Sequence, residues 1–166
     1  EVDSQVGKGS VVRIALSVRV DEEQSGQSSG DDRNIPDNIA GMCVLLVEDN
    51  EINCEIVEFI LRDAGAKVVT ANDGKVAVDT FTASEPGVFD CVLMDLMMPV
   101  MSGYEASRVI RGLDRADAKT VPIIALSANA FDEDIALAKD AGMNAHLAKP
   151  VDIHKMFQVM SRLKHQ

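Results

Sequence analysis

Residues 89–95 read FDCVLMD, an apolar run that is interrupted only by Asp90 and closed by Asp95. Such a run predicts a strand over 89–94 that is buried on both faces, as in a parallel sheet. The segment LMMPVMSG follows at once. Open α/β sheets place their chemistry at the carboxyl ends of their strands. Asp95 is therefore the first candidate for a functional carboxylate.

Two further acids follow a strand of the same kind. Residues 43–47 read CVLLV and lead directly into Glu48 and Asp49. The spacing to Asp95, about one strand-helix-strand-helix unit, predicts that the two strand ends lie side by side in a parallel sheet. Three carboxylates so close together repel one another. Protonation or a hard divalent cation such as Mg²⁺ relieves that repulsion, and Lys149 offers a third remedy.

Strand and helix patterns alternate through the second part of the chain, which predicts an α/β protein with a doubly wound parallel sheet. Asn50 and Asp152 are expected to cap helices, and Gly65 and Gly142 to end them. The expected strands are 43–47, 67–71, 89–94, 122–126 and 144–148, and the expected helices are 51–64, 74–84, 103–111, 131–140 and 152–163. The residues that follow four of these strands are Asp49, Asp95, Ser127 and Lys149.

Composition limits the range of functions. The chain has 166 residues, of which 46% are hydrophobic, and a net charge of −11, which argues against nucleic-acid binding. No apolar run is long enough to cross a membrane, and no signal segment opens the chain. The three cysteines lack metal or disulfide spacing, which favours reduced thiols and a cytoplasmic location. The sequence begins without methionine and is expected to be part of a longer protein. Membrane anchoring of that parent protein through segments outside this chain stays open.

The first 38 residues have a different character. Residues 10–20 alternate between apolar and polar, which predicts one half-buried strand with no partner nearby. Residues 21–38 are rich in Asp, Ser and Gly and are expected to form a flexible linker. Because an unpaired apolar strand favours edge pairing, we expect that it pairs with another copy of the chain in a strand-mediated dimer.

Four segments together resemble the response-regulator receiver domain, above all the receivers attached to hybrid sensor histidine kinases. These segments are LLVEDNEIN at 45–53, DCVLMDLMMPVMSGYEASRVIR at 90–111, PIIALSANAF at 122–131 and GMNAHLAKPVD at 142–152. The resemblance runs from about Met42 to the end of the chain. It implies a flavodoxin-like (βα)5 sheet in the order 2-1-3-4-5. It also implies a phosphorelay function, in which Mg²⁺ assists phosphoryl transfer from a histidine kinase or a histidine phosphotransfer domain.

The resemblance also implies roles for individual residues. Asp95 would be the phosphoacceptor, with Glu48, Asp49, Asp95 and the backbone carbonyl of Met97 around Mg²⁺. Ser127 and Lys149 would hold the phosphoryl oxygens, and the Lys149–Pro150 bond is expected to be cis. His146 stands where the family usually has the aromatic switch residue. Met97 and Asn129 stand where side chains usually position the hydrolytic water.

The helix expected over 51–64 carries the predicted partner surface. At about 100° per residue its buried face is expected to comprise Asn53, Val57, Ile60 and Ala64. Ile52 and Phe59 fall at the edge of that face, beside charged residues. Apolar groups rimmed by charge favour an interaction site. By resemblance this helix docks a helical histidine-containing domain.

The segment GKGSVVRIALSV at 7–18 is similar to the closing strand of a histidine-kinase ATP-binding domain. Residues 1–20 are therefore expected to be a remnant of that domain, followed by the linker and by a receiver over 39–166. The parent protein would be a hybrid kinase. This part of it cannot bind ATP as a kinase does, and it would catalyse only its own phosphorylation and dephosphorylation.

Other interpretations of the same residues stay open. An aspartate-nucleophile phosphatase also has an Asp after a buried strand, but its second Asp, two residues on, is replaced here by Met97. A flavodoxin-like flavin carrier shares the fold, although Glu48 and Asp49 would repel a flavin phosphate. A pseudo-receiver that only binds partners is a third alternative. The four methionines near Asp95 and the three histidines are not expected to bind metal.

Overall fold

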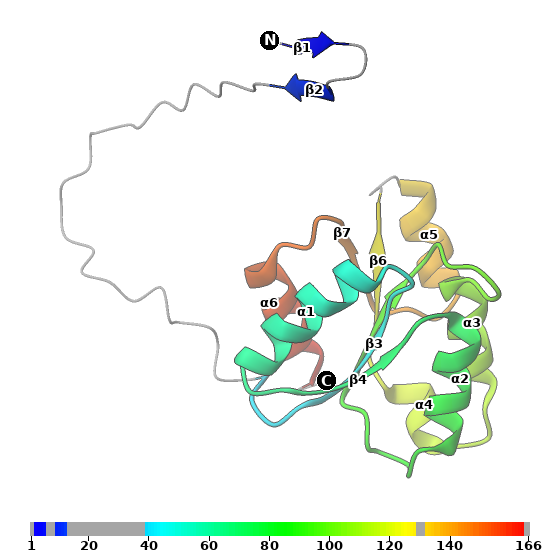
Figure 1. Cartoon of the computed structure of the whole chain (residues 1–166). Coiled ribbons are helices and arrows are strands. Elements are labelled where there is room, and N and C mark those ends of the chain that lie inside the picture. The colour runs from blue at the N-terminus through cyan, green and yellow to red at the C-terminus, as the bar shows by residue number, and fades with distance from the viewer. Residues whose placement is uncertain (1, 6–8, 13–38, 129–131, 165–166) are drawn as a thin grey trace. The chain divides into compact units, whose positions relative to one another are not determined.

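The computed structural model describes residues 2–5, 9–12, 39–128 and 132–164, and the chain divides into two compact units, residues 1–31 and 32–166. In the first unit, β1 (Val2–Gln5) pairs with β2 (Gly9–Val12) in an antiparallel hairpin in which Val2 lies opposite Val12. Figure 1 draws this hairpin as a pair of blue arrows.

The hairpin corrects the expectation that the strand starting at Ser10 has no partner nearby. The backbone of β2 is paired within the chain, by β1, over Gly9–Val12. Residues 13–20 of the expected strand lie outside the described residues. This pairing does not test the expected strand-mediated dimer, which stays a prediction.

The second unit is an α/β sandwich around one parallel sheet. Its sheet has five strands in the order β4-β3-β5-β6-β7, which is the predicted order 2-1-3-4-5. The strands are β3 (Cys43–Val47), β4 (Lys67–Ala71), β5 (Cys91–Asp95), β6 (Ile123–Ser127) and β7 (Ala145–Ala148). The helices are α1 (Glu51–Asp63), α2 (Gly74–Ala83), α3 (Gly103–Gly112), α4 (Ala116–Thr120), α5 (Asp132–Asp140) and α6 (Ile153–Lys164).

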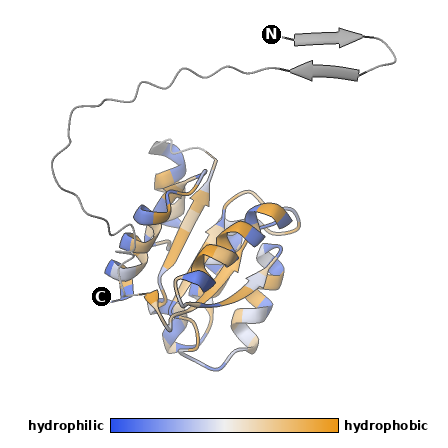
Figure 2. Cartoon of the chain, turned by 60° about the vertical axis from the view of Figure 1, so that its left-hand side comes forward, coloured by the Kyte–Doolittle hydropathy of each residue, from blue (hydrophilic) through white to orange (hydrophobic). Residues whose placement is uncertain are grey.

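Alternate residues of each central strand face two separate cores. Val92 and Met94 of β5 pack with Phe81 of α2 and Ile110 of α3, while Leu93 packs on the opposite face. That opposite core contains Leu61 of α1 and four side chains of α6, namely Met156, Phe157, Met160 and Leu163. In Figure 2 the strands are largely orange and the helices mix orange with blue. Burial of both sheet faces explains why the central strands read as continuous apolar runs.

The strand register brings four polar residues to one edge of the sheet. Val47 pairs with Met94, Asp95 with Leu126, and Ser127 with Ala148. Because the strands are parallel, Glu48, Asp95, Ser127 and Lys149 all follow or close strands at the same end. The predicted convergence of these residues is confirmed.

Several element boundaries differ from those expected by one or two residues, and one helix was not predicted. The strand predicted at 89–94 is β5, Cys91–Asp95, so Asp95 is its last residue and does not follow it. The helix α4 was not predicted. Its five residues, ADAKT, carry no apolar periodicity, and only Ala118 is buried. The predicted caps are confirmed, since Asn50 accepts from the Asn53 N–H and Asp152 from the Lys155 N–H.

The predicted face of α1 is partly wrong. Val57, Ile60 and Ala64 pack against the core as expected, but Asn53 is exposed and the one fully buried residue of the helix is Leu61. The buried face is therefore turned from the predicted one toward Leu61, while it still includes Val57, Ile60 and Ala64. Asn53 lies in the first turn of the helix, beyond the edge of the core, where its side chain reaches Glu48 instead.

Candidate functional site

Glu48 is fixed by the way β3 turns into α1. Its backbone N–H still donates to the carbonyl of Ala71 at 3.0 Å, so the strand pairing continues one residue past β3. Its side chain is buried and accepts a hydrogen bond from Asn53 Nδ2 at 2.9 Å. Sequence reasoning missed this role of Asn53. A polar residue in the first helical turn after an acidic strand end is the signal that could have suggested it.

The position of Asp95 is fixed by the loop that follows it. Its Oδ1 accepts from the Met97 N–H at 3.1 Å, and the next residue, Leu96, donates its N–H to Leu126 at 3.1 Å. The loop then returns to α3, where the Gly103 N–H donates to the Leu96 carbonyl at 3.1 Å. Asp95 is buried, and both of its carboxylate oxygens have a partner in this structure.

Lys149 closes the site from β7. Its backbone N–H donates to the Ser127 carbonyl at 2.7 Å, and the peptide bond to Pro150 is cis, as expected. Its ammonium group donates to Glu48 Oε2 at 2.5 Å and to Asp95 Oδ2 at 2.6 Å. One cation therefore bridges the two buried carboxylates.

The bridge decides the charge of Lys149. Burial acts to lower its pKa, but the hydrogen bonds to Asp95 and Glu48 outweigh burial, so that the pKa of Lys149 lies above its ordinary value. Lys149 is thus an ammonium ion at neutral pH. A fixed positive charge beside a carboxylate is well placed to attract the oxygens of an anionic group that reaches Asp95.

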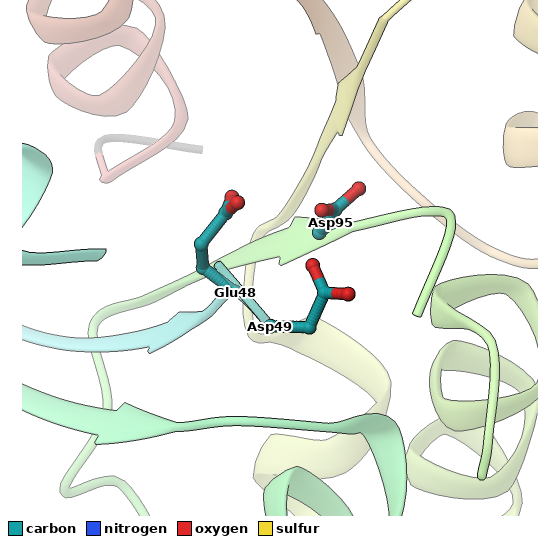
Figure 3. Close-up of side chains that lie close together, drawn as sticks. All are labelled: Glu48, Asp49 and Asp95. Atoms are coloured by element: carbon teal, nitrogen blue, oxygen red, sulfur yellow. The ribbon is translucent and has the colours of Figure 1, made fainter. Parts of the chain in front are cut away.

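The acidic residues could hold a metal ion. Glu48, Asp49 and Asp95 each offer a carboxylate oxygen, and these oxygens lie within 4.8 Å of one another. Figure 3 shows Glu48 and Asp49 after the end of β3 and Asp95 at the end of β5. Two of these residues are buried and Asp49 is exposed. An all-oxygen set that includes an exposed member suits Mg²⁺, which keeps several of its own waters.

Ser127 and His146 are in direct contact. The Ser127 hydroxyl lies 2.7 Å from His146 Nε2. Ser127 is buried and His146 is half-buried. The contact joins the predicted switch hydroxyl to the residue at the predicted switch position.

An apolar surface adjoins the site. The exposed side of α1 presents Ile52, Ile56 and Phe59, with Phe59 71% exposed. Sequence reasoning predicted Ile52 and Phe59 at this surface and missed Ile56. Beside it lies a groove of about 260 Å³, to whose lining Glu48 and Lys149 also contribute. Its apolar lining comes mainly from α1 and from the segment around α6: Ile56, Val57, Ile60, Val151, Ile153 and Met156.

The loop after Asp95 is strained at one residue. Val100 has a φ of 67°, in the left-handed region that β-branched residues rarely adopt. Its side chain is 83% exposed and gains little from packing. Met97, in the same loop, is 76% exposed. The strain therefore lies in the loop that positions Asp95.

Replacing Val100 by Asn is expected to stabilise the protein by about 1 kcal/mol, because Asn tolerates the left-handed conformation. Thermal unfolding of the two proteins measures this gain. Val76→Asn is the matched control, since Val76 is an exposed valine inside α2 and has no positive φ. An equal rise in Tm for both variants would show that the gain does not come from strain at Val100.

The structure thus brings together Glu48, Asp49, Asp95 and Lys149, with Ser127 on the neighbouring strand end. Asn129 lies outside the described residues. The residues that match the family model extend from 44 to 161, and the model is that of the response regulator receiver domain. The chain belongs to this family.

Two curated relatives are a histidine kinase and a sensor protein. The chain is 38% identical over 123 residues to the peroxide stress-activated histidine kinase mak1 of Schizosaccharomyces pombe, a match that covers 74% of this chain and 8% of mak1. It is 36% identical over 118 residues to the sensor protein GacS of Pseudomonas syringae, covering 70% of this chain and 13% of GacS. The chain therefore matches only a small part of either protein.

Solved receiver domains have the same fold. The receiver domain of the sensor histidine kinase PA1611 from Pseudomonas aeruginosa, solved with a magnesium ion in its active-site cleft, is 38% identical with a TM-score of 0.69, over 76% of this chain and 100% of that one. The receiver domain of Ssk1 from Saccharomyces cerevisiae, crystallised with the histidine phosphotransfer protein Ypd1, is 30% identical. Its TM-score is 0.67, and the match covers 76% of this chain and 91% of the other.

Among the helices that the structure describes, none is long and apolar enough to cross a membrane.

Proposed function

We propose that this receiver is the phosphoacceptor domain of a hybrid sensor histidine kinase, and that Asp95 takes a phosphoryl group from a phosphohistidine. The observation that carries the proposal is the Lys149 ammonium group held between the buried carboxylates of Glu48 and Asp95. A domain that only binds partners has no need of this buried cluster of charge, which costs desolvation energy. The similarity to the histidine kinase mak1 supports the same function.

The chemistry assigns a role to each residue. A carboxylate oxygen of Asp95 attacks the phosphorus, the bond from phosphorus to the histidine nitrogen breaks, and an acyl phosphate forms while the nitrogen leaves with its electron pair. Lys149 and Ser127 then hold the phosphoryl oxygens by charge and by hydrogen bonding. Glu48, Asp49, Asp95 and the Met97 carbonyl would hold Mg²⁺, which supplies further positive charge to those oxygens when it is bound.

Incubation with acetyl phosphate and Mg²⁺, followed by intact mass measurement, tests this function. We expect the mass of a single phosphoryl group to be added, and we expect EDTA to prevent the addition, because the acidic oxygens repel the donor when no cation is bound. Uptake that is unchanged by EDTA would contradict the metal site. No uptake under any condition would leave the chain a pseudo-receiver.

The surface around Phe59 is proposed to bind the histidine-containing partner. The phosphotransfer protein Ypd1 was crystallised with the receiver of Ssk1, a structural relative of this chain. In this chain the exposed apolar residues of α1 adjoin the groove to which Glu48 and Lys149 contribute, so a partner bound there could bring its histidine to Asp95.

Phe59→Asp is expected to slow phosphoryl transfer from a phosphorylated histidine phosphotransfer protein by at least about tenfold, since it removes an exposed aromatic anchor. Phosphorylation by acetyl phosphate should not change. Val109→Asp, which changes an exposed valine on α3 in the same way, is the matched control and should affect neither reaction. If Phe59→Asp slowed both donors equally, damage to the fold would be the better explanation.

The lifetime of the acyl phosphate is proposed to depend on Met97. A thioether offers a hydrolytic water almost no hydrogen bond, so self-hydrolysis should be slow. Met97→Asn supplies an amide at the mouth of the site and should speed loss of the phosphoryl group several-fold, as followed by intact mass. Met98→Asn, one residue further on, is the control. An unchanged lifetime in Met97→Asn would rule out this account.

The domain organisation follows as part of the proposal. Residues 1–20 would be a remnant of an ATP-binding domain, residues 21–38 a linker, and residues 39–166 the receiver. We infer a cytoplasmic location for this part of the protein, because a phosphohistidine donor must reach it.

A further inference from the structure

The contact between Ser127 and His146 joins two neighbouring strands, β6 and β7. β6 and β7 are paired so that Ala125 lies beside His146 and Ser127 beside Ala148. The Ser127 hydroxyl and His146 Nε2 are 2.7 Å apart, a normal distance for a strong hydrogen bond. Ser127 is the last residue of β6, which lies beside β5, and β5 ends in Asp95, where a phosphoryl group is proposed to bind.

The protonation of His146 decides which of the two residues donates. A hydroxyl carries one proton and two lone pairs, so Ser127 can donate to one acceptor at a time and accept from others. Neutral imidazole with a bare Nε2 accepts the Ser127 proton. Imidazolium has a proton on both nitrogens and can only donate. The direction of this hydrogen bond therefore reverses when His146 takes up a proton.

The surroundings of His146 keep it neutral in the resting protein. Burial lowers the pKa of His146, the carboxylate of Asp134 on α5 acts to raise it, and the ammonium of Lys155 on α6 acts to lower it, with a net result below the ordinary value. The Tyr104 hydroxyl on α3 lies 3.5 Å from Asp134 Oδ1. The neutral ring accepts the Ser127 proton in the tautomer that carries its own hydrogen on Nδ1.

We propose that His146 is a positioning residue that holds the Ser127 hydroxyl proton in the unphosphorylated protein and releases it to a phosphoryl oxygen when His146 itself becomes protonated. The proposal rests on the proposed function, since it needs a phosphoryl group on Asp95. It gives His146 a task that differs from the inward swing of an aromatic ring, because the imidazole acts through a hydrogen bond.

Protonation of His146 favours a bound phosphoryl group in two ways. Imidazolium donates to the Ser127 oxygen and leaves its proton for the phosphoryl group, and its positive charge also favours the anionic phosphoryl oxygens. By linkage the coupling is reciprocal, so phosphorylation must raise the pKa of His146 as much as protonation favours the phosphorylated state. Acidic conditions should therefore strengthen binding of a phosphoryl group or its mimic.

An NMR titration of the histidine ring protons, with and without beryllofluoride and Mg²⁺, tests the coupling. We expect beryllofluoride to raise the titration midpoint of His146 by about one pH unit, corresponding to tenfold coupling. His154 on α6 is exposed and serves as an internal control whose midpoint should not move. The same titration in Ser127→Ala should show a clearly smaller rise, because only the charge effect is left.

A second measurement separates positioning from a merely structural role. Beryllofluoride affinity is measured at about pH 8 and about pH 5.5, on either side of an ordinary histidine pKa, for the wild type and for His146→Phe. Both proteins share the carboxylates, so the difference between their pH profiles reports His146 alone. We expect acidification to favour binding to the wild type by up to about tenfold relative to His146→Phe.

The outcomes distinguish the two proposals. Beryllofluoride that binds while the His146 midpoint stays fixed and the two pH profiles coincide would overturn the role of His146 and leave the proposed function intact. If beryllofluoride bound to none of the proteins, the proposed function would fail, and the role of His146 with it.

Discussion

Asp95→Asn is expected to take up no phosphoryl group from acetyl phosphate under conditions that modify the wild type fully. An amide oxygen is a far weaker nucleophile than a carboxylate, so the acyl phosphate cannot form. The substitution preserves shape and can keep the hydrogen bond from the Met97 N–H. It removes the negative charge that pairs with Lys149 and contributes to the acidic cluster.

Intact mass spectrometry with Mg²⁺ present measures this loss. Asp90→Asn is the matched control, because Asp90 lies just before β5, at its opposite end, where its Oδ2 accepts from the Cys43 N–H at 2.7 Å, a bond that an amide oxygen can replace. We expect the control to be phosphorylated like the wild type. Equal modification of the Asp95→Asn protein would refute the assignment of Asp95.

Gly103→Ala is expected to destabilise the receiver by about 2 kcal/mol or more and to impair the site. A Cβ atom at Gly103 would lie 2.1 Å from the carbonyl oxygen of Asp95 and 3.0 Å from Met94 Cγ. Backbone atoms cannot turn aside as a flexible side chain can. Either α3 or the end of β5 must therefore move, and movement of β5 displaces the Asp95 carboxylate from Lys149.

Chemical denaturation and phosphoryl uptake together measure this effect. Gly112→Ala, at the other end of α3, is the matched control, since a Cβ there meets nothing within 4 Å. Because Ala is the better helix former, the control should be neutral or slightly stabilising. Similar losses in the two variants would show that the cost lies in the helix and not in the close approach to Asp95.

The sheet and the acidic residues were predictable because their signals are local. A continuous apolar run such as residues 91–94 has few alternatives to a strand buried on both faces, and the residue after each run then lies at a known edge. The hydrogen bonds of Asn50 and Asp152 are equally local, since each spans three residues. These features are decided by neighbours in the sequence.

Helix α4 was not predictable in this way because distant residues hold it. Arg111 donates to the Ala118 carbonyl within α4 and to the Val121 carbonyl after it. Arg115 binds Asp117 and also reaches the Phe81 carbonyl at the end of α2. A five-residue helix gains little stability by itself, so these tertiary contacts decide whether it forms.

The buried face of α1 was predicted incorrectly for another reason. Apolar residues occur around most of this helix, from Ile52 and Ile56 through Phe59 to Leu61, so the sequence leaves its buried face uncertain by about one residue. The contact of Ser127 with His146 was also beyond the sequence, although both residues were singled out. The two residues are 19 positions apart along the chain. They meet only because of the register in which β6 pairs with β7.

β7 has only four residues and lies at the edge of the sheet, where β6 is its one neighbouring strand. It contains His146 and leads directly into Lys149, so fraying of this strand would withdraw the imidazole and the ammonium group together. Local opening of an edge strand requires less free energy than global unfolding. Amide hydrogen exchange in β7 should therefore be faster than in β5. A protein built in this way can lose the Lys149 ammonium group from beside Asp95 while most of its backbone remains protected.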